Sequence, residues 1–213
     1  MQHSLILLGD LGVGTNLVKN LFLLDDRFSS PFNYELVETL YDGTFNNWID
    51  KEYTTRLHCI ADSVDVDVLE PNLYVNHSAF HNSEDFAKLQ KLGHCVALIP
   101  KSDRAFDWQI RAYIEKAGNV LDFGGTTTEE NILNMHEIMY TNKCAMESSG
   151  VDILYTDSLY KGDFDSFYKD TQTLVNIDYE HAKKIYEQWY ACHWDWEDTL
   201  NWKYYANRSN IQT

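Results

Sequence analysis

Short runs of apolar residues alternate along this chain with longer segments in which apolar residues recur every three or four positions. The apolar runs occupy residues 5–8, 73–75, 95–99 and 151–155, and their lengths predict buried strands. The helical patterns occupy residues 17–24, 83–92, 102–116, 126–146 and 178–194. This alternation predicts a doubly wound parallel sheet in three α/β/α layers, in which ligands bind at the carboxyl ends of the strands.

A glycine-rich turn connects the first predicted strand to the first predicted helix. It reads Gly9-Asp10-Leu11-Gly12-Val13-Gly14-Thr15-Asn16. Such a turn exposes backbone N–H groups around a helix N-terminus, where the macrodipole also favours negative charge, so it can hold a phosphate without a cationic side chain. We therefore predict a phosphate-binding loop. The alternative is a bare glycine turn between a buried strand and its crossover helix.

The spacing of Gly9 and Gly14 is that of a Walker A motif, but the residues that follow differ. Thr15 and Asn16 stand where that motif has lysine and Ser/Thr. Those two side chains grip the γ-phosphate and Mg²⁺ in P-loop NTPases. Their replacement disfavours ATP hydrolysis, so a nucleotide kinase is the least favoured functional interpretation of this chain.

Charge and composition narrow the class of protein and its partners. The 213 residues are 44% hydrophobic and 14% aromatic, which predicts one globular domain over residues 1–213, with an aromatic C-terminal helix and tail from about residue 178. A net charge of −16 repels phosphodiester backbones, so nucleic acid is not an expected partner. The acidic runs at 25–26 and 62–67 are interpreted as solvated surface.

The cysteines and the apolar runs predict a cytoplasmic protein. Cys59, Cys95, Cys144 and Cys192 form no CxxC pair, so they are expected to be buried thiols in a reducing compartment. The chain shows neither a signal peptide nor an apolar run near the roughly 18 residues of a membrane span. The histidines show no metal-ligand spacing, and no metal is expected.

The order and spacing of these elements resemble the sulfotransferase family, whose P-loop-like fold binds the sulfate donor PAPS. The resemblance extends over most of the chain. The family's phosphosulfate loop, Lys/Arg-Ser/Gly-Gly-Thr-Thr/Ser, falls on residues 12–16, so that Gly14 and Thr15 match and Gly12 occupies the cationic position. The resemblance implies PAPS or PAP contacts at Gly9, Gly12, Val13, Gly14, Thr15, Asn16 and Leu17.

A second matching segment supplies a candidate base. The cytosolic sulfotransferases have Pro-Arg-x-x-Lys-Thr-His, whose histidine deprotonates the acceptor hydroxyl, and residues 71–77 keep the proline-to-histidine spacing. The resemblance makes His77 the candidate general base, with Val75 at the lysine position. Alternatively, His77 is a polar residue that only ends the second predicted strand.

A third matching segment follows the strand at 95–99. The family often reads Leu-Arg-Asp-Pro-Val-Asp-Arg-Ala-Tyr-Ser there, and its Asp-Arg-Ala-aromatic core is kept at residues 103–106. The arginine and serine that bind the 3′-phosphate of PAPS fall on Ile99 and Asp107, and an aspartate would repel a phosphate. Lys101, Ser102 and Arg104 are the candidate replacements, with an ordinary surface role as the alternative.

The resemblance implies in-line transfer of a sulfuryl group from PAPS to the hydroxyl of a small acceptor, without a metal. The second interpretation is a non-catalytic protein of the same fold that binds a nucleotide or a protein partner. It follows from the uncharged residues Gly12, Val75 and Ile99 at positions where the family has cations.

Overall fold

The computed structural model describes residues 4–10, 12–28, 55–56, 73–76, 83–117, 124–125 and 128–191. Its elements in chain order are β1 (Leu5–Leu8), α1 (Thr15–Phe22), β2 (Thr55–Arg56), β3 (Leu73–Asn76), α4 (Ser83–Leu92), β4 (His94–Ile99), α5 (Asp103–Ala117), α6 (Thr128–Ser148), β5 (Asp152–Tyr155), α7 (Asp157–Lys161), α8 (Phe164–Thr171) and α9 (Tyr179–Ala191).

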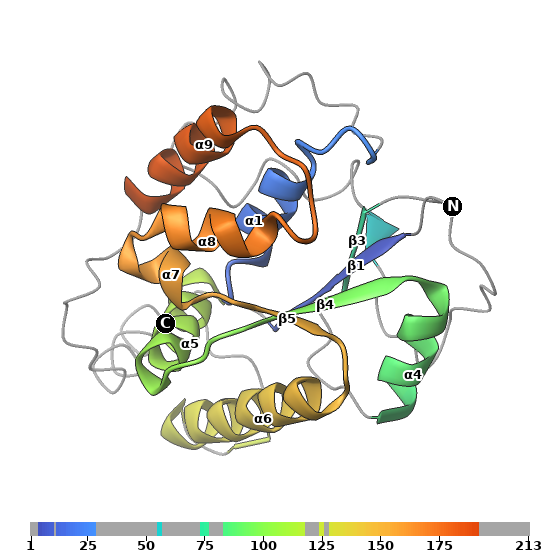
Figure 1. Ribbon diagram of the computed structural model, residues 1–213. Helices are drawn as coiled ribbons and strands as arrows, with labels where there is room; N and C mark the ends of the chain where they lie inside the picture. The colour runs from blue at the N-terminus through green and yellow to red at the C-terminus, as the bar shows by residue number, and fades with distance from the viewer. Residues whose placement is uncertain are drawn as a thin grey trace.

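The strands form one parallel sheet in the order β2-β3-β1-β4-β5, with β1 at its centre (Figure 1). Leu5 of β1 lies opposite Leu73 on one side and His94 on the other, and Leu8 lies opposite Asn76 and Ala97. A parallel sheet of this kind must have both faces covered, which explains why β1 and most of β4 are apolar at every position.

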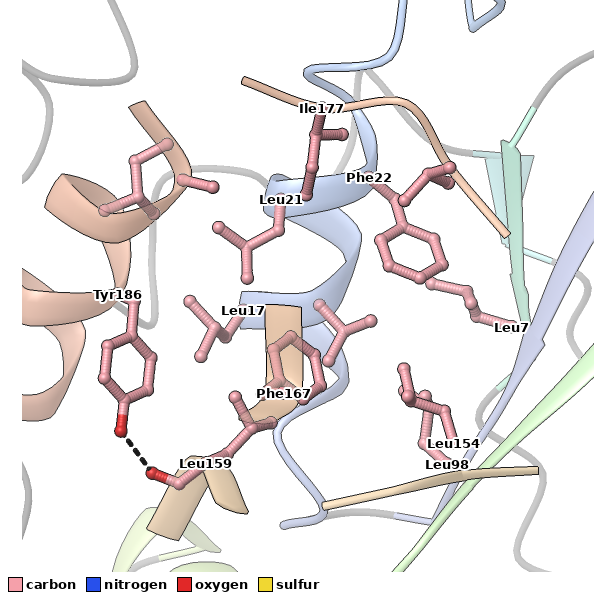
Figure 2. Packing of buried hydrophobic residues seen from close by; sticks show 14 of the residues in the cluster. Leu7, Leu17, Leu21, Phe22, Leu98, Leu154, Leu159, Phe167, Ile177 and Tyr186 are labelled. Atoms are coloured by element: carbon pink, nitrogen blue, oxygen red, sulfur yellow. Dashed lines mark hydrogen bonds between the residues drawn. The ribbon is translucent and has the colours of Figure 1, made fainter. Parts of the chain in front are cut away.

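One face of the sheet packs against α1, α8 and α9. Leu7, Leu98 and Leu154 project from the strands on this side and meet Leu17 and Phe22 of α1 in one buried cluster (Figure 2). The same cluster includes residues of α5, α7, α8 and α9, among them Trp108, Leu159, Phe167, Tyr186 and Trp189. The Tyr186 hydroxyl donates to the Leu159 carbonyl oxygen at 2.7 Å and so connects α9 to α7.

The other face of the sheet packs against α4 and α6 (Figure 1). Ile6, Leu8 and Ala97 alternate with the residues of the first face and are buried with Leu89 of α4 and Met146 of α6. Successive side chains of a strand point to opposite faces, so one apolar run supplies both cores. The predicted α/β fold with a parallel sheet in three layers is therefore confirmed.

Most element positions agree with the predictions, and three differences stand out. The predicted helix at 17–24 begins earlier, at Thr15, with Gly14 in the left-handed region at its N-cap position. The two-residue strand β2 lies between the first predicted helix and the strand predicted at 73–75, where the apolar pattern predicts no strand. Helices α7 and α8 were not predicted, because five and eight residues are too short to establish a helical period. Gly162, at φ 79°, ends α7, and the Asp163 side chain caps α8 by accepting from the Ser166 N–H.

Two predictions about exposure are wrong. Asp25 is buried rather than solvated: its carboxylate pairs with Arg27 at 2.7 Å and accepts from the Asn176 N–H at 2.6 Å. Burial works against its ionisation, but these hydrogen bonds hold the pKa of Asp25 below its usual value. Cys144 is exposed on α6, whereas Cys95 is buried, and burial raises the pKa of its thiol to about 12.

No helix in the described part of the chain is both long and apolar enough to cross a membrane. The acidic run at 62–67 and the aromatic residues beyond 191 lie outside the described residues. Of the aromatic C-terminal residues, Trp189 is buried in the core, and Tyr190 packs against that core.

Candidate functional site

The glycine-rich turn follows β1, the central strand of the sheet. After β1 the chain moves to β2 and β3 on one side, and later crosses to β4 and β5 on the other. Ligands of open α/β sheets bind where the direction of the connections changes, outside the carboxyl ends of the strands. The turn, the segment after β4 and the segment after β5 meet at this edge of the sheet.

Two glycines give the turn a backbone shape that other residues rarely adopt. Gly12 and Gly14 have φ values of 86° and 87°, in the left-handed region. Gly14 is the N-cap residue of α1, and it carries no side chain that could satisfy the N–H groups of the first helical turn. The N-terminal end of α1 therefore presents uncapped donors at the carboxyl end of β1.

Gly9 allows the two ends of the turn to approach each other. A Cβ atom at this position would lie 2.9 Å from Val13 Cγ1, 3.0 Å from Thr15 Oγ1 and 3.4 Å from the Leu98 Cβ. Contacts this short exclude a side chain at residue 9. The close approach also shows that the Thr15 side chain extends back across the turn towards its first residue.

Thr15 carries a hydroxyl that the described part of the protein leaves unsatisfied. The residue is 4% exposed, and its Oγ1 atom has no hydrogen-bond partner among the described residues. A buried hydroxyl without a partner costs free energy, of the order of 1–3 kcal/mol. Thr15 occupies the position of the Walker A lysine.

Helix α7 holds the turn from the other side. The Tyr160 hydroxyl donates to the Gly12 carbonyl oxygen, and Leu159 lies beside Gly14. In a trans peptide the carbonyl and the following N–H point in opposite directions, so the Val13 N–H is directed away from Tyr160. It makes a long contact of 3.4 Å with the Asp10 carbonyl oxygen. Burial raises the pKa of Tyr160, so its hydroxyl stays a proton donor.

Asp10 is a buried carboxyl within the turn itself. It is 4% exposed, and Asn142 Nδ2 of α6 lies 3.2 Å from each of its carboxylate oxygens. Burial raises the pKa of Asp10 to about 7, and the Asn142 hydrogen bond offsets part of that rise. Asp10 therefore changes its charge within the neutral pH range.

The segment after β4 is held by a carboxylate rather than left open. Asp157, in the first turn of α7, accepts from the Lys101 N–H at 2.6 Å and from the Ser102 N–H at 3.0 Å. The Ser102 hydroxyl donates to the same carboxylate at 2.5 Å. The donors that could have met a phosphate at Ser102 are directed to Asp157 instead.

The two candidate cations are on the surface at the same edge. Lys101 is exposed, and its Nζ atom lies 5.3 Å from the centre of the Tyr155 ring. Arg104 is exposed in the first turn of α5. Asp107 is half-buried, and this burial raises the pKa of its carboxyl. The interaction with His136 opposes that rise, and the nearby Asp103 carboxylate adds to it.

The other predicted site residues differ in what the structure says of them. Val13 and Leu17 are fully buried in the core, so only their backbone groups can reach a ligand. His77, the candidate base, lies outside the described residues, and the side chain of Asn16 is not described. The structure thus brings residues 9, 12–15, 101 and 102 to one edge of the sheet.

Comparison with protein-family models, with curated proteins and with solved structures finds no match to this chain.

Several residues important at this edge were not identified from sequence. Asn142 and Tyr160 are more than a hundred residues away along the chain from the turn that they contact. Asp157 likewise comes from a distant segment. Asp10 could have been singled out from sequence, because an acidic residue inside a predicted anion-binding turn would repel the anion.

Proposed function

We propose that this protein binds the phosphate end of a nucleotide at the backbone N–H groups of Gly12 to Asn16. The observation that supports this most is the buried hydroxyl of Thr15 at the uncapped N-terminus of α1, which has no hydrogen-bond partner in the part of the chain that the structure describes. Helix N-termini that follow glycine turns favour anions through their free N–H groups and their dipole. An oxygen of a bound phosphate would accept from the Thr15 hydroxyl and relieve its burial cost.

The topology supports a P-loop type of fold. A central parallel strand runs into a glycine turn with the spacing of Gly9 and Gly14, and the turn runs directly into α1. Strand, glycine turn and helix are the components of a P-loop. With Thr15 in place of lysine, the turn would hold its phosphate through backbone groups and a hydroxyl.

The activity that we propose on this fold is sulfuryl transfer from PAPS to a hydroxyl acceptor. His77 would accept the proton of the attacking hydroxyl, because it is the next residue in the sequence after β3, which pairs with β1. The N–H groups at residues 12–16 would stabilise charge on the transferred group. The acceptor oxygen forms its bond to sulfur as the bond from sulfur to the bridging phosphate oxygen breaks, and PAP leaves.

A specific contact favours the second candidate, a non-catalytic nucleotide-binding protein. Asp157 takes up the N–H groups of Lys101 and Ser102 and the Ser102 hydroxyl, where the family binds the 3′-phosphate. Loss of one preorganised charge contact commonly costs about 2.7–4 kcal/mol of transition-state stabilisation. Ile99 is buried in the cluster between the sheet and helices α4 and α6, so it cannot replace the arginine of the family.

Thermal unfolding with sulfate, AMP, PAP and PAPS tests the proposal, because a ligand that binds the folded state raises the unfolding temperature. All four are expected to stabilise the protein. The Gly14→Asp variant, which places a carboxylate at the α1 N-terminus, is expected to lose the effect. No stabilisation by any of them would overturn phosphate binding. Stabilisation without transfer of labelled sulfate from PAPS to a phenol or sugar panel would select the non-catalytic candidate.

A further inference from the structure

Asp10 places a carboxyl group inside the turn that is expected to bind an anion. It follows Gly9 directly and precedes Gly12 by two residues, and its backbone carbonyl accepts from the Val13 N–H. Its side chain is buried against α6. A buried carboxylate and a bound anion so close in the chain repel each other, and burial weakens the screening by water.

Within the described ranges of the chain, the groups that contact Asp10 and its turn do not neutralise this repulsion. Asn142 offers an amide, which can donate to a carboxylate and, after rotation, accept from a protonated carboxyl. Residues one turn away from Asn142 on α6 are uncharged: Ile138, Met139, Ala145 and Met146. From α7, the Tyr160 hydroxyl is bound to Gly12 and the Asp157 carboxylate to Ser102, while β4 contributes the apolar Leu98.

We propose that an anion binds to the Gly12–Asn16 turn together with a proton, which Asp10 takes up from solvent. The inference rests on the proposed phosphate site and adds to it a residue that determines when the site can be occupied. The neutral carboxyl remains hydrogen-bonded to Asn142, and no like charge then opposes the anion. By linkage, proton and anion each increase the affinity of the protein for the other.

The pH dependence follows from the ionisation of Asp10 near neutrality. Burial raises the pKa of Asp10 to about 7, and a bound anion raises it further. Anion affinity should be highest at pH values below this midpoint and should fall as pH rises through it. For binding that requires the protonated carboxyl, the dissociation constant should increase about 30-fold between about pH 6 and about pH 8.5.

Sulfate is the probe for this test, because its charge is constant through the neutral range. Its dissociation constant is measured by titration calorimetry at both pH values, and repetition in buffers of different ionisation enthalpy gives the number of protons bound. The wild-type protein should show the increase and take up protons. Asp10→Asn, which keeps the size of the side chain and can pair with Asn142, should bind sulfate equally at both pH values.

Two further variants complete the design. Asn142→Leu removes the hydrogen bond that lowers the pKa of Asp10, so the pH midpoint of binding should shift upward. Asp170→Asn, on the exposed surface of α8, is the matched control and should behave as wild type.

Sulfate binding that is independent of pH in the wild-type protein, or a pH dependence that persists in Asp10→Asn, would overturn the inference and leave the phosphate site standing. An unmoved midpoint in Asn142→Leu would also overturn it. Absence of sulfate binding at both pH values would overturn the inference and the proposed phosphate site together.

Discussion

The Tyr160 hydroxyl donates to the Gly12 carbonyl oxygen across 148 positions of the sequence. This contact attaches α7 to the glycine turn and orients the peptide between Gly12 and Val13. Tyr160 is buried in the same apolar cluster as residues of α8 and α9. The packing of these helices is therefore connected to the shape of the candidate site.

Replacement of Tyr160 by phenylalanine should loosen the turn. The change leaves the Gly12 carbonyl without its partner, and loss of one partner of a buried hydrogen bond costs about 1–3 kcal/mol. Denaturant unfolding should show this loss, and sulfate affinity should fall. Tyr168→Phe is the control, because its hydroxyl donates to the Ile177 carbonyl at 2.8 Å, away from the turn. Equal sulfate affinity in both variants would contradict a positioning role for Tyr160.

Substitution of Gly14 by aspartate should abolish anion binding. The new residue would be strained at φ 87°, at a cost of about 1–2 kcal/mol, and its carboxylate would compete for the N–H groups of α1. Gly150→Asp is the matched control, because Gly150 has φ 76° and open space around it at the end of α6. Both variants should lose similar stability by chemical denaturation. Only Gly14→Asp should lose stabilisation by sulfate; retained binding would place the anion elsewhere.

Asp10 should make the protein less stable as pH rises. Its folded-state pKa of about 7 exceeds the usual 3.8, so the folded state binds more protons between these values and stability falls across that window. The Asp10→Asn variant should not lose stability in this way, because its amide does not ionise. At pH 8 its free energy of unfolding should exceed that of the wild-type protein by up to about 4 kcal/mol, a difference that should shrink towards pH 4. Parallel pH profiles of the two proteins would show that Asp10 is not perturbed.

A contact with a 3′-phosphate can be detected by comparing two nucleotides. If Lys101 and Arg104 replace the family's arginine, PAP should stabilise the protein more than AMP does. Arg104→Ala should remove that difference, because a hydrogen bond to a charged group contributes roughly 1.5–3 kcal/mol. Lys161→Ala, exposed in the last turn of α7, serves as the control for loss of a positive charge. An equal response to PAP and AMP in the wild-type protein would favour the non-catalytic candidate.

Sulfuryl transfer should depend on His77 and not on a divalent metal. Removal of a general base commonly lowers the rate by about 10²–10⁴-fold, so His77→Ala should be nearly inactive with PAPS and a phenolic acceptor. Addition of EDTA should leave the rate unchanged. His181→Ala, on the exposed surface of α9, is a suitable control. A folded His77→Ala protein with the wild-type rate would show that another group accepts the proton.

The local pattern of the sequence was sufficient to predict the main strands, the glycine turn and the layered α/β class. A buried strand such as Leu5–Leu8 is recognised from a few consecutive residues, and glycines signal a turn through their own backbone freedom. These features depend on neighbours along the chain. The same local reasoning placed Gly9 to Gly14 correctly between a strand and a helix.

What the tertiary structure alone decided concerns polar groups whose environment comes from distant segments. Asp25 reads as a surface residue in the sequence, but in the fold it is buried and accepts from the Asn176 N–H. Ser102, a candidate ligand contact, donates to Asp157. Asp10 acquires its neutral-range pKa only because α6 covers it and Asn142 faces it. The ionisation and availability of a polar side chain are set by desolvation and partners, which sequence neighbours do not specify.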